Sequence, residues 1–175
     1  MKTYLFWIDC EMTGLDWNND HILEIAYIIT DFNCSEIIAK NEYVIFQTNE
    51  ILLSMNEWCK KHHAQSHLIA KVQNSKTSYS DAEKNICSDL EKLSKENTTI
   101  YIAGNSVYND VVFLKKYIPK IFNFLHYRII DISSLKIISQ EKYHINFEKQ
   151  KKHRALDDIQ ESIHEYQFYL KNIFK

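Results

Sequence analysis

The alternation of apolar and polar residues predicts strands at the start of the chain. Tyr4 to Cys10 and Ile22 to Phe32 are nearly continuous apolar runs, which is typical of buried strands. Glu36 to Gln47 is predicted to be a third strand, after turn residues at Asn33 and Ser35. Because the connections are short, we expect these three strands to form an antiparallel meander.

After residue 48 the apolar spacing becomes helical. Asn49 to Val72 is predicted to be a helix broken near its middle, and Ser80 to Lys95 a helix whose capped start is Ser80 to Glu83. The later predicted elements are a strand at Thr98 to Ala103, a helix at Val107 to Tyr117, a strand at Tyr127 to Ile132, and helices at Ser133 to Gln140 and Ala155 to Asn172. This order indicates an α/β fold, a mixed five-stranded sheet flanked by helices, in one domain over residues 1–175.

The composition excludes several classes of protein. Apolar residues make up 45% and aromatic residues 13% of the chain, which is too much for a disordered protein. Two glycines and one proline are too few for the glycine-rich loops that bind nucleotide phosphates. No apolar run approaches the roughly 20 residues of a membrane-spanning helix, so we expect no membrane partner.

The charge balance restricts the nucleic acids that the chain could bind. It has 21 Lys and Arg against 23 Asp and Glu, a net charge of −2. Proteins that hold long nucleic acids neutralise many phosphates with clustered basic residues, and this chain has no such surplus. A short phosphate-containing substrate fits this balance better.

Cysteine usage predicts a reducing environment. The four cysteines are far apart, no C-x-x-C pair occurs, and the segment after Met1 has a strand pattern instead of a signal-peptide pattern. We therefore expect free thiols and a cytoplasmic protein.

The first candidate chemical feature is a pair of acids at the end of the first strand. Residues two apart on a strand project from the same face, so Asp9 and Glu11 point together. If this strand is buried, the two carboxylates repel each other and need a cation or a proton. The alternative is that both acids lie in water just beyond the sheet.

Two more segments carry acids at element boundaries. Asp110 falls on the first turn of the helix that follows Gly104, where an acid can also simply favour the helix dipole. In the last helix, Asp158 flanks the apolar stripe, whereas Asp157 lies opposite it and should be solvated. The stripe consists of Ala155, Ile159, Ile163, Tyr166 and Leu170.

Together these acids form a chemically coherent set. Asp9, Glu11, Asp110 and Asp158 can hold two hard divalent ions through oxygen ligands. Two such ions can activate water and stabilise the leaving oxygen of a phosphodiester. His153, just before the last helix, has an unperturbed pKa suited to accept a proton from that water.

At these residues the chain resembles the oligoribonuclease family of DEDD exonucleases, in the branch whose last motif carries a histidine. The matching segments are Trp7 to Asp16 followed by Ile22 to Ala26, Ala103 to Ser106 with Asp110, His126 to Arg128 with Asp131, Ser133 and Leu135, and His153 to Ile159 with Glu161 and Ser162. Their order and spacing cover essentially the whole chain.

The resemblance implies a ribonuclease-H-like sheet, an obligate homodimer, and two divalent metal ions, Mg²⁺ or Mn²⁺. It also implies 3′-to-5′ hydrolysis of very short RNA, above all dinucleotides, to nucleoside 5′-monophosphates. The implied metal ligands are Asp9, Glu11, Asp110 and Asp158, and the implied general base is His153. The implied substrate contacts are Leu15 and Trp58 against the two bases, and Ser106, Ser133 and His63 around the 5′ end together with Tyr127 and Arg128 from the other subunit.

Simpler readings remain for several of these residues. His63 and His67 stand four apart and could be zinc ligands, although the sequence offers no third ligand. Trp58 could be a core residue, and Tyr127 could fill the sheet.

Two other functions compete with the exoribonuclease. A DNA-trimming or proofreading 3′-to-5′ exonuclease of the same superfamily would use the same acids. A non-catalytic nucleic-acid-binding module could keep the fold, but we would then expect an acid or the histidine to be missing, and none is.

Overall fold

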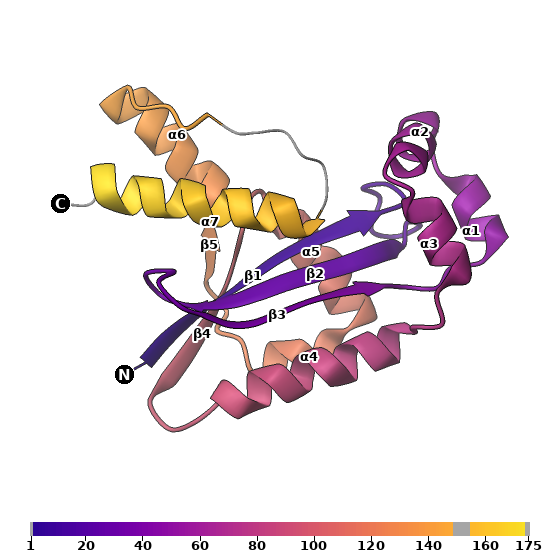
Figure 1. Ribbon diagram of the computed structural model, residues 1–175, viewed down its shortest axis with the longest axis horizontal. Coiled ribbons are helices and arrows are strands. Elements are labelled where there is room, and N and C mark those ends of the chain that lie inside the picture. The colour runs from indigo at the N-terminus through magenta and orange to yellow at the C-terminus, as the bar shows by residue number, and fades with distance from the viewer. Residues whose placement is uncertain (1, 149–154, 174–175) are drawn as a thin grey trace.

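The computed structural model describes residues 2–148 and 155–173 and contains the predicted mixed five-stranded sheet. Its strands are β1 (Lys2–Met12), β2 (Ile22–Asp31), β3 (Ile37–Val44), β4 (Thr98–Gly104) and β5 (Ile129–Asp131), in the order β3-β2-β1-β4-β5 (Figure 1). The first three strands pair antiparallel, whereas β4 is parallel to β1 and β5 is parallel to β4. The fold class and the meander are therefore confirmed.

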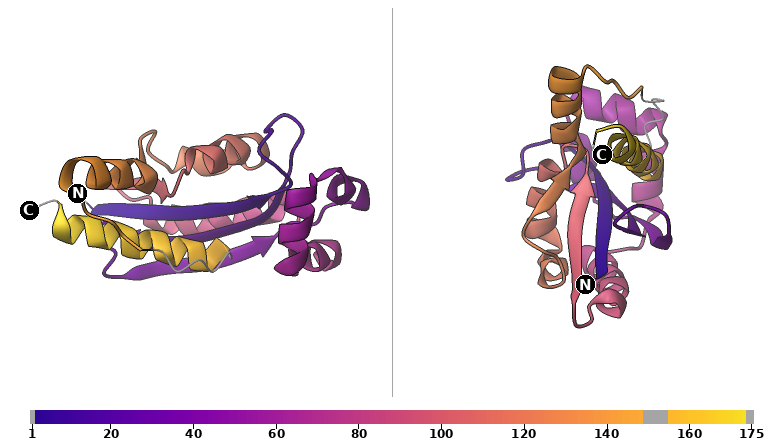
Figure 2. Two further views of the ribbon diagram at one scale, coloured as in Figure 1. Left: turned by 90° about the horizontal axis from the view of Figure 1, so that it is seen from above. Right: turned by 90° about the vertical axis from the view of Figure 1, so that its left-hand side faces the viewer.

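Helices cover both faces of the sheet and one of its ends. They are α1 (Asn49–Ser54), α2 (Glu57–Gln65), α3 (Leu68–Asn74), α4 (Tyr79–Leu93), α5 (Tyr108–Tyr117), the 3₁₀ helix η1 (Pro119–Asn123), α6 (Ile132–Tyr143) and α7 (Ala155–Asn172). The α1–α3 group lies at the end of the sheet where β1 finishes (Figure 1), and the edge-on view separates α7 from α5 across the sheet (Figure 2). This arrangement leaves the carboxyl end of β1 between α7, α5 and α2.

The alternation of side chains along β1 assigns each residue to one layer. Phe6 and Ile8 belong to the core formed with α4 and α5, and Leu5 and Trp7 belong to the core formed with α7. All four side chains are almost completely buried. Odd-numbered positions of β1 therefore face α7, and even-numbered positions face the opposite layer.

Several predicted boundaries were wrong. The helical region after residue 48 is three short helices, because Asn56 caps α2 with its side chain and His67 adopts a left-handed conformation with φ of 60°. The capping box of α4 uses Ser78 with Asp81, two residues earlier than predicted. The last strand, predicted from Tyr127, begins only at Ile129, and α6 already begins at Ile132.

The predicted apolar stripe of α7 is nearly correct. Ala155, Ile159 and Tyr166 are buried against β1 and β2, as expected. At the carboxyl end the fully buried residue is Tyr169, whereas Leu170 is only partly buried. The two residues are neighbours, about 100° apart around the helix, so the stripe is shifted by one position at this end.

Candidate active site

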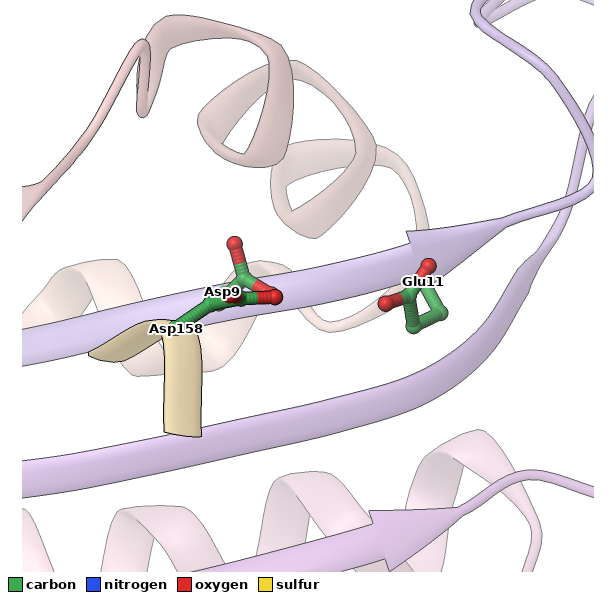
Figure 3. Close-up of side chains that lie close together, drawn as sticks. All are labelled: Asp9, Glu11 and Asp158. Atoms are coloured by element: carbon green, nitrogen blue, oxygen red, sulfur yellow. The ribbon is translucent and has the colours of Figure 1, made fainter. Parts of the chain in front are cut away.

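Three of the predicted acids converge at the end of β1. Asp9 and Glu11 lie on the β1 face that is covered by α7, and Asp158 lies in the first turn of α7. One carboxylate oxygen from each lies within 4.8 Å of the others (Figure 3). Asp157 is partly buried, not fully solvated as predicted, but it is not a member of this group. The helix therefore presents Asp158 to the two strand acids.

The fourth acid, Asp110, reaches the same strand from the opposite layer. Its Oδ1 accepts a hydrogen bond from the backbone N–H of Cys10 at 2.9 Å, and Cys10 lies between Asp9 and Glu11. Gly104 makes this approach possible, because a Cβ there would lie 2.9 Å from the carbonyl oxygen of Ile8. The turn into α5 can therefore sit directly against β1.

The site is electrostatically unfavourable for a set of bare carboxylates. Removal from water raises the pKa of Asp9 well above its ordinary value, and the charges of Asp110, Glu11 and Asp158 raise it further. Burial likewise raises the pKa of Asp110 to about 7, although the hydrogen bond from Cys10 opposes the shift. Such a group of oxygen ligands is stabilised by a hard divalent cation, so these residues fit the implied metal site.

Glu24 adds a further acid that the sequence reasoning did not single out as functional. It pairs with Glu11 across β1 and β2, and it is 4% exposed. Burial, followed by the neighbouring Glu42, raises the pKa of Glu24 to about 8. The sequence could have indicated this residue, because it is a charged residue within the apolar run of β2, a strand that is buried on both faces.

His63 lies next to Glu11 instead of at the surface. Its Nε2 is 2.9 Å from the carbonyl oxygen of Met12, and its Nδ1 is 3.9 Å from Glu11 Oε2. Burial lowers the pKa of His63, which favours the neutral imidazole. The alternative zinc pair fails, because His67 is exposed and lies beyond the end of α2.

Leu15 and Trp58 are both displayed at the surface. Leu15 is 71% exposed in the loop between β1 and β2, and Trp58 is 69% exposed on α2. The Trp58 ring stacks on His62 with 4.7 Å between ring centroids and 10° between planes. Trp58 is therefore not a core residue, and its outer ring face is open for stacking.

Asp131 brings two of the predicted substrate-binding residues together. Its Oδ1 accepts the backbone N–H groups of Ser106 at 3.0 Å and Ser133 at 2.9 Å, and the Ser133 hydroxyl at 2.5 Å. Ser106 has a left-handed backbone with φ of 54°, which this bond supports. Asp131 is thus a positioning residue whose role the sequence alone did not reveal, because the contact spans 25 residues.

Tyr127 and Arg128 point into solvent beside the sheet edge. The Tyr127 ring is 80% exposed and stacks on His126 with centroids 4.5 Å apart. The Arg128 guanidinium lies over the Tyr127 ring at 5.2 Å. Tyr127 therefore does not fill the sheet, and both side chains are available to a second molecule.

The predicted general base, His153, lies outside the residues that the structure describes. Its role therefore stays a prediction.

Comparison with known proteins assigns the family. An exonuclease family model matches residues 6–166. Human mitochondrial oligoribonuclease is 42% identical over the whole of this chain and 75% of its own length. The chain belongs to the oligoribonuclease family. A second oligoribonuclease, from Francisella tularensis subsp. novicida, is 45% identical over 94% of this chain and 93% of its own length.

Solved structures agree with the fold. Exonuclease I from Methylocaldum szegediense superposes with a TM-score of 0.73 at 15% identity over 99% of this chain. A zinc-bound complex of E. coli exonuclease I with single-stranded DNA gives a TM-score of 0.73 at 13% identity over all of this chain. This oligoribonuclease-family chain spans about two fifths of the length of those proteins, 41% and 42%, so the likeness concerns the fold alone.

One further finding concerns membranes. Within residues 2–148 and 155–173, no helix combines the length and the apolar content that crossing a bilayer requires.

Proposed function

We propose that this member of the oligoribonuclease family is a 3′-to-5′ exoribonuclease that hydrolyses very short RNA, above all dinucleotides, to nucleoside 5′-monophosphates. The observation that carries the proposal is the convergence of Asp9, Glu11 and Asp158 within 4.8 Å, with Asp110 bonded to the intervening Cys10. This acid set, in a chain of this family, suits phosphodiester hydrolysis.

Asp9, Glu11, Asp110 and Asp158 would hold two divalent ions, Mg²⁺ or Mn²⁺. When bound, such ions supply activation of water and stabilisation of the leaving oxygen. The chain contributes the geometry: β1 fixes two acids, α7 fixes one, and the Cys10 N–H orients the carboxylate of Asp110. His153 would accept the proton from the attacking water as general base.

The substrate would be held by residues that surround the acids. Leu15 and Trp58 offer exposed apolar surfaces against which two bases can pack. His63, with the Ser106 and Ser133 pair that Asp131 holds, would contact the 5′ end. With a net charge of −2 the chain offers no broad basic surface, which favours a short substrate over a long one.

A second copy of the chain would complete the site as a homodimer. The edge strand β5 and helix α6 expose Ile129 (39%), Ile137 (62%) and Ile138 (48%) beside Tyr127. An exposed strand edge with apolar neighbours is a natural pairing surface. Tyr127 and Arg128 would then close over the substrate bound to the other subunit.

A cytoplasmic location is the last part of this proposal. All four cysteines are free, and Cys10 and Cys59 are buried. Thiols in this state suit a reducing compartment.

The test is a time course on 5′-labelled RNAs of two to seven nucleotides with Mn²⁺, alongside DNAs of the same lengths and one long single-stranded DNA. Shortening from the 3′ end, fastest for the RNA dinucleotide, would support the proposal. Faster cleavage of long single-stranded DNA would favour a DNA exonuclease instead. If no substrate yields a mononucleotide, the non-catalytic nucleic-acid-binding module would be favoured instead.

A further inference from the structure

The β1–β2 loop and α5 enclose a cleft whose residues the proposed reaction does not use, apart from Leu15. Its volume is about 560 Å³, within the range of roughly 300–1,000 Å³ that is typical of small-molecule sites. Leu15 and Trp17 line it from the loop, and Tyr108, Asn109, Lys115 and Lys116 line it from α5. Trp17 is 52% exposed and Tyr108 is 66% exposed.

Hydrogen bonds within the loop keep its conformation fixed. The Asp20 carboxylate accepts the Thr13 hydroxyl at 2.7 Å and the Asp16 N–H at 2.9 Å. Gly14 allows this packing, because a Cβ there would lie 2.4 Å from Asp20 Oδ2.

Hydrogen bonds from α5 then fix the loop as one wall of the cleft. The Lys116 ammonium donates to the carbonyl oxygens of Trp17 and Asn18 at 2.9 and 3.0 Å. Tyr117 donates its hydroxyl to the carbonyl of Asp20 at 2.7 Å. The cleft is therefore largely preformed, which lowers the entropic cost of binding.

The lining of the cleft suits a nucleobase. Two large aromatic side chains in its lining can stack on a flat ring, and such stacking is worth about 1–3 kcal/mol per base. Asn109 offers an amide that can bond to a base edge. The charged residues that line the cleft are Lys115 and Lys116, so an attached phosphate would meet positive charge.

Two of the lining residues link the cleft to the proposed catalytic site. Leu15 lines the cleft and is also one of the two residues expected to pack against the bases. Asn109 directly precedes Asp110, whose carboxylate is bonded to β1. A base in the cleft would thus contact Leu15 as well as the aromatic walls.

We propose that this cleft binds the base of one nucleotide of the substrate, with Trp17 and Tyr108 as its aromatic walls. The inference rests on the proposed function. Both residues act on substrate affinity, and neither takes part in the chemical step.

The experiment compares Trp17→Ala and Tyr108→Ala with wild type on the RNA dinucleotide ApA. From the stacking energy we expect KM to rise about 5- to 150-fold, with kcat within about twofold. Trp17→Phe keeps a ring and should restore most of the affinity. Phe46→Ala removes an exposed aromatic ring outside the cleft (49% exposed) and should leave KM unchanged.

Abasic analogues locate the contact. When the base that binds in the cleft is removed from the dinucleotide, Trp17→Ala should no longer raise KM. When the other base is removed, Trp17→Ala should still raise KM. The Kd of ApA for Asp158→Asn, with and without Trp17→Ala, repeats the comparison without turnover. An unchanged KM, or an equal effect on both abasic analogues, would overturn the inference.

The two proposals fail in different ways. If wild type does not release mononucleotides from ApA, the proposed function fails, whatever the variants do. If wild type is active and the Trp17 and Tyr108 variants match it, only the cleft assignment fails.

Discussion

The acidic site and the β5–α6 edge differ in how much of their structure one chain supplies. At the acidic site, β1 and α7 hold three carboxylates within 4.8 Å, in partly buried positions. At the β5–α6 edge, Tyr127 and Ile137 are 80% and 62% exposed to solvent. One chain thus brings the acids of the candidate site together, whereas the proposed capture of substrate would also use a second copy.

The largest effect should come from the acidic site. Asp158→Asn removes one oxygen charge from the group and should lower kcat by about 10³-fold or more, since it removes stabilisation of charge at the reacting phosphate. The matched control is Asp157→Asn, which lies outside the group and should be nearly silent. Both are checked by release of mononucleotides from a dinucleotide. Loss of activity in the control alone would mean that the wrong aspartate was chosen.

His153→Ala should slow the chemical step by about 10²–10⁴-fold, the usual contribution of a general base. Because His153 is not one of the implied metal ligands, stabilisation of the variant by Mn²⁺ should match wild type. The two measurements are single-turnover rates and thermal melts with and without metal. A near-normal rate would assign the proton transfer to another group.

A substitution at the β5–α6 edge should weaken substrate binding instead of slowing the chemical step. Ile137→Glu places a charge on the apolar edge and should dissociate the proposed dimer, raising KM at least about tenfold while leaving stabilisation by Mn²⁺ intact. The matched control is Ile37→Glu on β3 at the opposite sheet edge, where the side chain is 57% exposed. Sedimentation and KM are measured on both variants. Dissociation with normal KM would separate assembly from substrate capture.

Arg128→Ala tests substrate binding at the same edge without disrupting the proposed dimer. It should weaken dinucleotide binding by about 1.5–3 kcal/mol, roughly 10- to 100-fold, because a charge-assisted bond to the substrate is lost. Sedimentation should be unchanged. The Kd of a dinucleotide for the Asp158→Asn protein, with and without Arg128→Ala, checks the prediction, and equal values would remove Arg128 from the site.

The smallest effect concerns stability in the absence of metal. Asp110 has a folded pKa raised to about 7, so the folded state binds more protons than the unfolded state between about pH 4 and 7. The contribution of Asp110 to the free energy of unfolding should therefore fall as the pH rises through this range. Asp110→Asn keeps the acceptor for the Cys10 N–H and should raise Tm at pH 8 by roughly a few °C.

The pH dependence itself is the control for this last prediction. At pH 4 the difference in Tm between Asp110→Asn and wild type should vanish, since the aspartate is then protonated in the folded state. Mn²⁺ at pH 8 should stabilise wild type more than the variant. A Tm difference between Asp110→Asn and wild type that does not grow from pH 4 to 8 would contradict the account.

The sequence predicted features that depend on local patterns and missed those that depend on contacts between distant segments. The sheet was predictable because buried strands leave apolar runs, and the pairing of Asp9 with Glu11 follows from strand alternation alone. The three-helix region was not, because its breaks depend on local caps at Asn56 and on the left-handed His67. Contacts between distant segments, such as Asp131 with Ser106, leave no local signal.

The acid site shows the same division. The position of the apolar stripe on the last helix favoured Asp158 over Asp157. The sequence of β1 does not indicate that Asp110, on α5, bonds to it from the opposite face of the sheet. The aromatic cleft was also hidden, since Trp17 and Tyr108 are 91 positions apart and only the loop and α5 bring them together.

The 2.9 Å bond from Cys10 to Asp110 Oδ1 is donated by the main-chain N–H of residue 10. The Cys10 side chain can consequently be replaced by another that packs in the core under α4 and α5. The main-chain bond to Asp110 would remain. Substitution should thus disturb the site less at Cys10 than at Asp9 or Glu11.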